Sequence, residues 1–348
     1  MRTAPRGSYP GNMLKWVGGR LERLAAEKPV LLAFLVLVAA TIVVIPASLP
    51  FYVDDTHGFV ENIMAEAHGT LFDLLIIGWF LLWLNKRAET RLTNNRYREE
   101  IEDYLGWKSP EATHRIAGNI RRLNRGGVKE KFRLTHAYLK GANLANASLR
   151  ESDLWGADAE GAALGGANLH GCNMAGANLE GADLERANLI EADLRGANLR
   201  EADLERATIS RADLRGATLI GVDLQYAILT FAHLERAHVG DKNEPGLRAN
   251  LREANLQGAN LRRADLTGAN MQGVNLRGAD LSDTIFDDVD LERANLIGAK
   301  FANDEAPAMV FKKVRSLRKT RFDPDVAERL MVLYPELFHW VSDSEEVH

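Results

Sequence analysis

Side chains able to do chemistry are few in this 348-residue sequence, and their spacing predicts neither a catalytic nor a metal site. The nine histidines are scattered, and the chain has no HExxH motif, no CxxC motif and no phosphate-cradling glycine loop. His170, His233 and His238 have no partner at ligand spacing. The single cysteine, Cys172, excludes an intrachain disulfide and is typical of a reducing compartment. We therefore expect no enzyme activity, no cofactor and no bound metal.

Carboxylates are different, because they recur within a five-residue word. Alanine, then Asp or Asn, then leucine precede two free positions in units centred on Leu139 to Val239 and on Leu251 to Phe301. Of these 32 units, 26 have alanine first and 25 have leucine third, so chance does not explain them. A period of five fits neither a helix nor a strand. It fits a coil with one corner per unit, in which alanine and leucine point inward and stacked coils form a solenoid.

This word resembles that of the pentapeptide repeat family. The resemblance implies a right-handed quadrilateral β-helix with four units, or twenty residues, in each coil. The 32 units would then make about eight coils. We expect this all-β solenoid to cover residues 132–303, with a two-residue insertion that makes a protruding turn at 240–248. Cys172 then becomes a small core residue, and Ala159, at a leucine position, leaves a thin spot.

A twenty-residue coil stacks acidic side chains in columns. Like charges about 5 Å apart repel each other, so each column needs water or a cation nearby. The expected state is a solvated surface that neighbouring arginines screen. The alternative comes from members of the family that mimic DNA and protect or inhibit type II topoisomerases, but 17 basic residues dilute the 25 acidic ones between 137 and 303. The columns are Asp183, Asp203 and Asp223, and Asp193 and Asp213.

Four outward positions are apolar although outward positions should be polar: Ile220, Tyr226, Ile228 and Phe231. An exposed apolar patch of this kind marks a site for a protein partner. The alternative is that the insertion at 240–248 folds over these side chains. The sequence favours neither interpretation.

The solenoid follows two apolar segments that predict membrane-spanning helices, at 29–53 and 68–85. Basic residues are concentrated in 1–28 and directly after the second segment, whereas the loop at 54–67 has only acidic charges. The positive-inside rule then predicts a multi-pass protein of the plasma (inner) membrane, with this loop outside and both termini in the cytoplasm. Asp73 is the one charge within the segments. It is a functional candidate by default, but the interpretation we favour is a position one turn inside the outer interface, where its side chain reaches water or a helix N-terminus.

Helices are expected on both sides of the solenoid. The cytoplasmic connector at 86–131 contains a helix that Ser109 can cap, that Pro110 can begin and that Gly126 can end, and this helix could close the start of the solenoid. The C-terminal part, 304–348, has a basic segment at 311–321 that could attract anionic lipid or nucleic acid. A helix at 323–341 follows it and either caps the solenoid or mediates dimerisation.

The function that these features favour is a membrane-tethered scaffold that presents a rigid cytoplasmic β-helix to a protein partner. Its expected partners are the lipid bilayer and an unidentified cytoplasmic protein, without direct binding of nucleic acid. Three alternatives stay open: a DNA-mimicking regulator of a type II topoisomerase, an oligomeric membrane channel with the β-helix as its regulatory domain, and a homo-oligomer of the scaffold itself.

Overall fold

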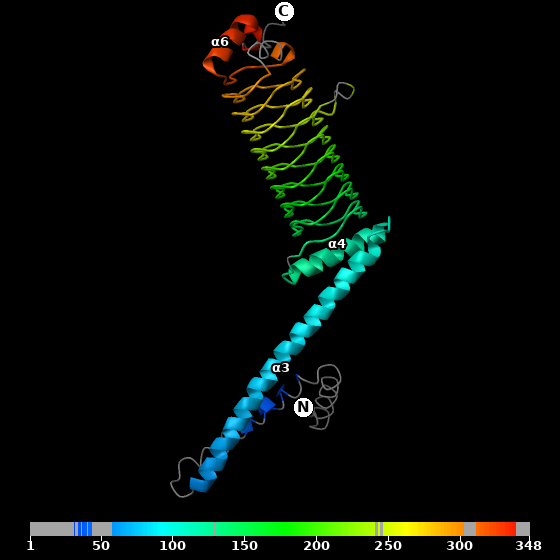
Figure 1. The fold of residues 1–348 in the computed structure, drawn as a ribbon, viewed down its shortest axis with the longest axis vertical. Coiled ribbons are helices and arrows are strands. Elements are labelled where there is room, and N and C mark those ends of the chain that lie inside the picture. The colour runs from blue at the N-terminus through cyan, green and yellow to red at the C-terminus, as the bar shows by residue number, and fades with distance from the viewer. Residues whose placement is uncertain are drawn as a thin grey trace, which may run out of the picture. The chain divides into compact units, whose positions relative to one another are not determined.

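The computed structural model describes residues 58–128, 130–240, 243, 246–302 and 311–338, with nine helical positions between 31 and 43. The chain divides into two compact units, Met1–Asn95 and Arg96–His348. The helices are α3 (Gly58–Tyr104), α4 (Pro110–Arg125) and α6 (Pro324–Leu333), with short 3₁₀ helices η1 (Phe311–Lys313) and η2 (Pro335–Leu337). A ladder of parallel β-bridges follows α4 and extends from Arg133 to Arg321 (Figure 1).

Helix α3 exposes apolar side chains on all sides of its middle part. Phe72, Trp79 and Trp83 are 64%, 62% and 44% exposed. A helix that is apolar all round has no polar face for water, and lipid is the solvent that suits it. Among the described residues, one helix, within His68–Tyr104, is long and apolar enough to cross a membrane.

The membrane segments differ in part from the sequence prediction. Helix α3 begins at Gly58 and not at residue 68, so residues 58–67 of the expected outer loop are helical. It continues without a break to Tyr104, beyond the expected end of the span at residue 85. The expected first span, 29–53, lies largely outside the described residues. The described part of the chain therefore supports one apolar anchor helix and not two spans.

The five-residue units form stacked coils, and each Asp or Asn position bridges the residue twenty positions further on. Asp203, for example, pairs in parallel with Asp183 and with Asp223. Between coils, the Leu204 N–H donates to the Asp223 carbonyl at 2.7 Å. The alanine and leucine positions point inward as predicted, and Ala202 and Leu204 are each 1% exposed. Cys172 is likewise buried, and burial raises the pKa of its thiol to about 12.

Each corner is a hydrogen-bonded turn over the two free positions. The Ala207 N–H donates to the Leu204 carbonyl at 3.0 Å, and Arg206, at the second free position, has a φ of 57°. The other non-glycine residues at this position have φ values between 55° and 62°. Glycine favours this left-handed conformation, which explains why it recurs there. The Asp or Asn side chain stabilises the same corner, since Asp203 Oδ1 accepts the Glu205 N–H at 2.9 Å. The sequence showed the Asp/Asn preference but did not reveal this cause.

The insertion at 240–248 is longer than predicted. Asp223 bridges Asn250, and His238 bridges Asp265, so the residues stacked across it are 27 positions apart instead of twenty. The unit centred on Leu251 thus directly follows the unit centred on Val239, and one corner contains seven extra residues instead of two. Spacing along the chain cannot distinguish these cases. The twelve residues from Val239 to Leu251 can be read as two units with two extra residues or as one unit with seven.

Helix α4 covers the N-terminal end of the β-helix, as predicted. Ser109 Oγ accepts the Ala112 N–H at 3.2 Å, and the helix ends at Arg125, before Gly126. Ile116, Ile120 and Leu123, which are fully buried, join the core of the solenoid.

The C-terminal end differs from the prediction, because the ladder continues past residue 303. Ser316 bridges Asp290 and Arg321 bridges Asn295, so part of the expected free basic segment belongs to the β-helix. Two of its basic residues are also paired, with Lys313 3.1 Å from Asp287 and Arg315 2.8 Å from Asp288. Helix α6 is shorter than the expected 323–341, and its Leu330 is buried in the same core.

Candidate interaction surfaces

The first acidic column lies along one side of the coils as predicted. Asp183, Asp203 and Asp223 stack directly, and Glu185 and Glu205 follow two residues after the first two. Arginines at the corner pair with these glutamates, with Arg206 Nη1 2.9 Å from Glu205 Oε1 and Arg186 Nε 3.3 Å from Glu185 Oε1. Each pair is substantially exposed, so its main effect is to reduce the charge of this side.

The second acidic column carries its own cations. Arg195 Nη2 lies 2.6 Å from Asp193 Oδ2, and Arg215 Nη2 lies 2.5 Å from Asp213 Oδ2. The hydrogen bond from Arg195 lowers the pKa of Asp193. Partial burial opposes the same change at Asp213, but the hydrogen bond and charge of Arg215 prevail and lower the pKa of Asp213. Both columns are therefore interrupted by guanidinium groups, as the screening interpretation predicts.

Three of the four apolar outward residues are exposed and lie together. Tyr226, Ile228 and Phe231 are 41%, 41% and 57% exposed, and we call them the apolar patch. Ile228 lies on a straight side of one coil, and Tyr226 and Phe231 occupy the corners at its two ends, each with a φ of 58°. These aromatic side chains stand where glycine is the easiest residue to accommodate. Arg206 lies over the Tyr226 ring, 5.4 Å from its centroid.

Ile220 does not belong to the patch. It is 9% exposed, and it lies two units earlier, on the opposite side of the four-unit coil. Leu247, from the insertion, lies close to the next residue, Gly221, since a Cβ added at Gly221 would lie 3.6 Å from Leu247 Cβ. The insertion thus approaches the chain directly after the buried Ile220, whereas Tyr226, Ile228 and Phe231 are exposed.

The side of the β-helix that carries Ile228 has no charged residue at its Asp/Asn positions from Ser148 to Asn295, and the column ends at Arg321. Ile228 is bridged to Thr208 on one side and to Asn255 on the other. No aspartate occurs in this column among the described units, unlike the three other columns. The members, in order, are Ser148, Asn168, Asn188, Thr208, Ile228, Asn255, Asn275, Asn295 and Arg321. A surface with little charge around an apolar cluster is the composition of a protein-binding surface.

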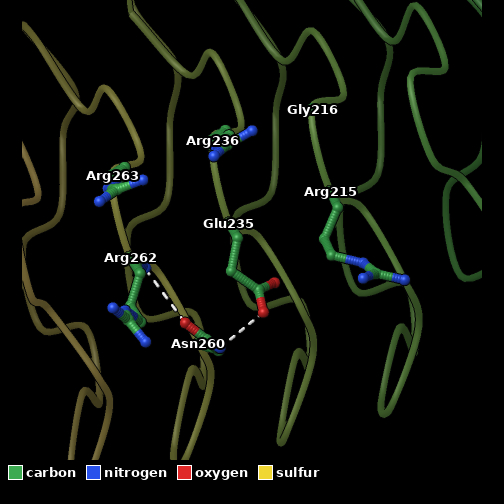
Figure 2. Close-up of a pocket in the computed structure, with 7 residues that line it drawn as sticks. All are labelled: Arg215, Gly216, Glu235, Arg236, Asn260, Arg262 and Arg263. Carbon is green, nitrogen blue, oxygen red and sulfur yellow. Dashed lines mark hydrogen bonds between the residues drawn. The ribbon is translucent and has the colours of Figure 1, made fainter.

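The coil that follows Phe231 forms part of a second feature, a cavity of about 470 Å³ lined by four arginines (Figure 2). We call it the arginine pocket; its residues are Arg215, Gly216, Glu235, Arg236, Asn260, Arg262 and Arg263. Asn260 forms hydrogen bonds to pocket residues of two neighbouring coils. The Asn260 Nδ2 group donates to Glu235 Oε1 at 2.6 Å, and Asn260 Oδ1 accepts the Arg262 N–H at 3.2 Å.

The sequence did not reveal the arginine pocket, because the pocket depends on the length of the insertion. Arg236 and Arg263 are neighbours in one corner column only if stacked residues are 27 positions apart. A two-residue insertion would place other residues beside Arg236. The sequence does show several arginines at free positions on both sides of the insertion. They predict a pocket only when the residues that stack across the insertion are known.

Asp73 lies on α3 with an exposed side chain, within the part of the helix that is apolar on all sides. The other candidate site residues all belong to the second compact unit, Arg96–His348. Among the described residues, no group of three or more His, Cys, Asp or Glu side chains could hold a metal ion.

A ladder of five-residue units with buried alanine and leucine defines a solenoid of the quadrilateral β-helix class. The family model described as pentapeptide repeats matches this region in eight copies, at residues 133–166, 162–200, 202–238, 248–283 and 275–303. The chain belongs to the pentapeptide repeat family. Proteins of this family are generally non-catalytic.

Solved structures of the same kind are similar to this region. HetL, a pentapeptide repeat protein involved in heterocyst differentiation regulation in the cyanobacterium Nostoc sp. strain PCC 7120, is 30% identical; the match covers 59% of this chain and 93% of HetL, with a TM-score of 0.31. Full-length QnrB1, a plasmid-mediated fluoroquinolone resistance protein, is 18% identical over 54% of this chain and 90% of its own, with a TM-score of 0.33. A pentapeptide repeat protein of the Arabidopsis thaliana thylakoid lumen is 27% identical over 39% and 79%, with a TM-score of 0.19. No curated protein matches the chain.

Proposed function

We propose that this protein is a membrane-anchored scaffold that binds a cytoplasmic protein partner through the apolar patch. The observation that carries the proposal is the exposure of Tyr226, Ile228 and Phe231 together on one coil. A rigid solenoid loses little conformational entropy when it binds, because its backbone is already fixed by the ladder. Large aromatic side chains are also the residues that most often dominate the binding energy of interfaces.

The anchor in this proposal is helix α3. Its exposed apolar side chains, Phe72 and Trp79 among them, need a lipid environment. At the end of this apolar part, Arg87 lies 5.1 Å from the centroid of the Trp83 ring. Tryptophan and basic residues are typical of the cytoplasmic interface of a membrane helix. The β-helix would then be on the cytoplasmic side.

We extend the proposal to a second span at residues 29–53. Two facts support it: this segment has no charged residue, and its described positions are helical. Phe34 also lies close to α3, since a Cβ added at Gly78 would be 3.2 Å from Phe34 Cδ2. Small residues such as glycine allow close packing between membrane helices. Both termini would then lie in the cytoplasm, in the plasma (inner) membrane orientation that the basic residues predict.

The DNA-mimicking function has less support. It requires an acidic surface with few interruptions, to copy the regular phosphates of DNA. Arg186 and Arg206 pair with the glutamates beside the first column, and Arg195 and Arg215 pair with the second column. These contacts favour the scaffold over a topoisomerase regulator.

The test is crosslinking in membranes from a photoreactive amino acid at Ile228, followed by mass spectrometry. We expect one dominant protein partner. A matched control carries the photoreactive residue at Asn188, in the same column but two coils away. In a second control, Tyr226→Asp and Phe231→Asp are combined with the probe at Ile228 and should abolish the crosslink. Aspartate is compatible with these corners, because Asp283 and Asp288 have φ values of 60° and 58° at equivalent positions.

Crosslinks from Ile228 only to residues of the same chain would contradict the proposal. The same holds for a set of partners that Asn188 captures equally well, because such crosslinks would not depend on the patch.

A further inference from the structure

The arginine pocket contains more positive charge than its own carboxylate can balance. In successive coils, Arg215, Glu235 and Arg262 form one column of first free positions, so a single carboxylate lies between two guanidinium groups. Arg236 and Arg263 are neighbours in the corner column beside it, and Figure 2 shows their side chains next to each other. Like charges this close destabilise each other unless an anion lies between them.

Two of the four arginines have ion-pair partners and two do not. Arg215 is engaged with Asp213, and Arg263 Nε lies 3.6 Å from Asp283 Oδ2. In the part of the chain that the structure describes, Arg236 and Arg262 form no ion pair. Both side chains are exposed, so an incoming anion could reach them.

Glu235 is not a sufficient counter-ion for this group. Its Oε1 atom accepts the Asn260 amide at 2.6 Å, and His233 Nδ1 lies 3.6 Å from the same atom. Its Oε2 atom is buried and has no hydrogen-bond partner. The glutamate is thus held toward the floor of the pocket by Asn260, and the guanidinium groups of Arg236 and Arg262 are left for another anion.

We propose that the arginine pocket binds carboxylate side chains from an acidic segment of a protein partner. This inference rests on the proposed scaffold function and names the chemistry of its partner. Phe231, at one end of the apolar patch, is followed after one corner by His233, Glu235 and Arg236. A partner that contacts Phe231 therefore meets the pocket by continuing around the same coil. Arginine binds carboxylates well, because its planar fork can donate two parallel hydrogen bonds.

The surroundings of the pocket favour a short acidic segment over a long polyanion. Along the same side of the β-helix, the Asp/Asn column contains Asp193 and Asp213 on one side of the pocket and Asp280 on the other. A nucleic-acid backbone that followed this side would approach those carboxylates and be repelled. A few glutamates or aspartates fit within the pocket and avoid them.

The test uses the full chain in detergent micelles and a fluorescein-labelled peptide of six glutamates, with binding followed by fluorescence anisotropy. The Arg236→Gln/Arg262→Gln variant should bind the peptide about tenfold more weakly, the typical effect of losing a charge-assisted hydrogen bond. The matched control, Arg277→Gln/Arg321→Gln, removes two exposed arginines from another side and should retain the wild-type affinity.

A third variant gives an effect of opposite sign. Glu235→Gln removes the negative charge of the pocket and retains an oxygen for the Asn260 amide, so it should bind the peptide several-fold more tightly. A variant that merely damaged the fold would not improve binding.

Equal losses in the pocket variant and the control would overturn the inference, as would an unchanged affinity of Glu235→Gln. Displacement of the peptide by pyrophosphate, or by a single-stranded oligonucleotide, at lower concentrations than unlabelled hexaglutamate would show a phosphate site and overturn the assignment to an acidic segment. Absence of peptide binding together with intact Ile228 crosslinks would overturn this inference and leave the scaffold function standing. Loss of those crosslinks with intact peptide binding would overturn the scaffold function at the apolar patch and leave the arginine pocket as an anion-binding site.

Discussion

At the residue scale, the side chain at each second free position lies over the equivalent residue of the next coil. The Phe231 ring packs against Gly258, where an added Cβ would lie 2.6 Å from Phe231 Cε1. His136 lies equally close to Gly156, and Asn146 to Gly166. Glycine at these positions therefore has two causes, the left-handed backbone and the side chain of the preceding coil.

These two causes can be separated by substitution. Gly181 has a φ of 61° and nothing within 4 Å of an added Cβ, so Gly181→Ala should cost only the left-handed strain, about 1–2 kcal/mol. Gly258, with a φ of 67°, should cost about 1–3 kcal/mol more when changed to alanine, because the methyl group meets the Phe231 ring. The measurement is the free energy of unfolding in urea, with the full chain in detergent and circular dichroism as the signal.

A double-mutant cycle supplies the control. Phe231→Ala should remove the additional cost of Gly258→Ala, so that the pair shows a favourable coupling. Equal costs at Gly181 and Gly258 would mean that the Phe231 ring moves aside freely, and the patch would then be less rigid than we propose.

At the element scale, α4 satisfies the backbone groups that the first coil leaves open. Asn124 Oδ1 accepts the Ser148 N–H at 2.7 Å, and Asn124 Nδ2 donates to the Ser148 carbonyl at 3.2 Å. Thr113 Oγ1 donates to the Tyr138 carbonyl at 3.0 Å. An uncovered coil would present unpaired groups of this kind, which invite pairing with another chain.

Asn124→Leu should therefore destabilise the β-helix by about 1–3 kcal/mol, because it removes the hydrogen-bond partners of the Ser148 backbone N–H and carbonyl groups. The decrease should appear in the unfolding midpoint of the full chain in detergent. Arg125→Leu is the matched control, since it adds the same side chain one residue later at an exposed position. A similar effect of both substitutions would show that the hydrogen bonds of Asn124 contribute little.

The sequence predicted those elements whose signals are local. Ser109, Pro110 and Gly126 mark the bounds of α4 by themselves, and the alanine and leucine positions mark the inside of every coil. The sequence failed where distant residues decide the outcome. The bridges of Ser316 and Arg321 depend on Asp290 and Asn295, which are too far away along the chain for a local pattern to record them.

The candidate sites follow the same division. Exposure of Tyr226, Ile228 and Phe231 followed from outward positions in one coil, whereas the outward position of Ile220 did not predict that its side chain is buried. The arginine pocket was not predictable until the register across the insertion was known.

At the scale of the whole molecule, the arrangement in the membrane decides which compartment contains each surface. We expect Asp55→Cys, in a Cys172→Ser background, to react with a membrane-impermeant maleimide on intact cells, because the proposed second span places residue 55 outside. Thr3→Cys should react only after the cells are permeabilised. Cys172 is buried, so its replacement by serine serves only to remove the background thiol.

Labelling of Thr3→Cys on intact cells would contradict the proposal of two spans. It would indicate a single span by α3, with the N-terminus outside. The β-helix would remain cytoplasmic in that arrangement, and the scaffold function would survive the correction.

The seven-residue corner has a consequence for how this solenoid can change. The bridges on either side of it, Thr218 with His238 and His238 with Asp265, are intact, so the extra residues leave the stacking undisturbed. This corner is therefore a site that tolerates insertions, where a peptide or a whole domain could be added without moving the apolar patch or the arginine pocket. The length of this corner and the outward side chains of the coils can therefore be changed independently of each other.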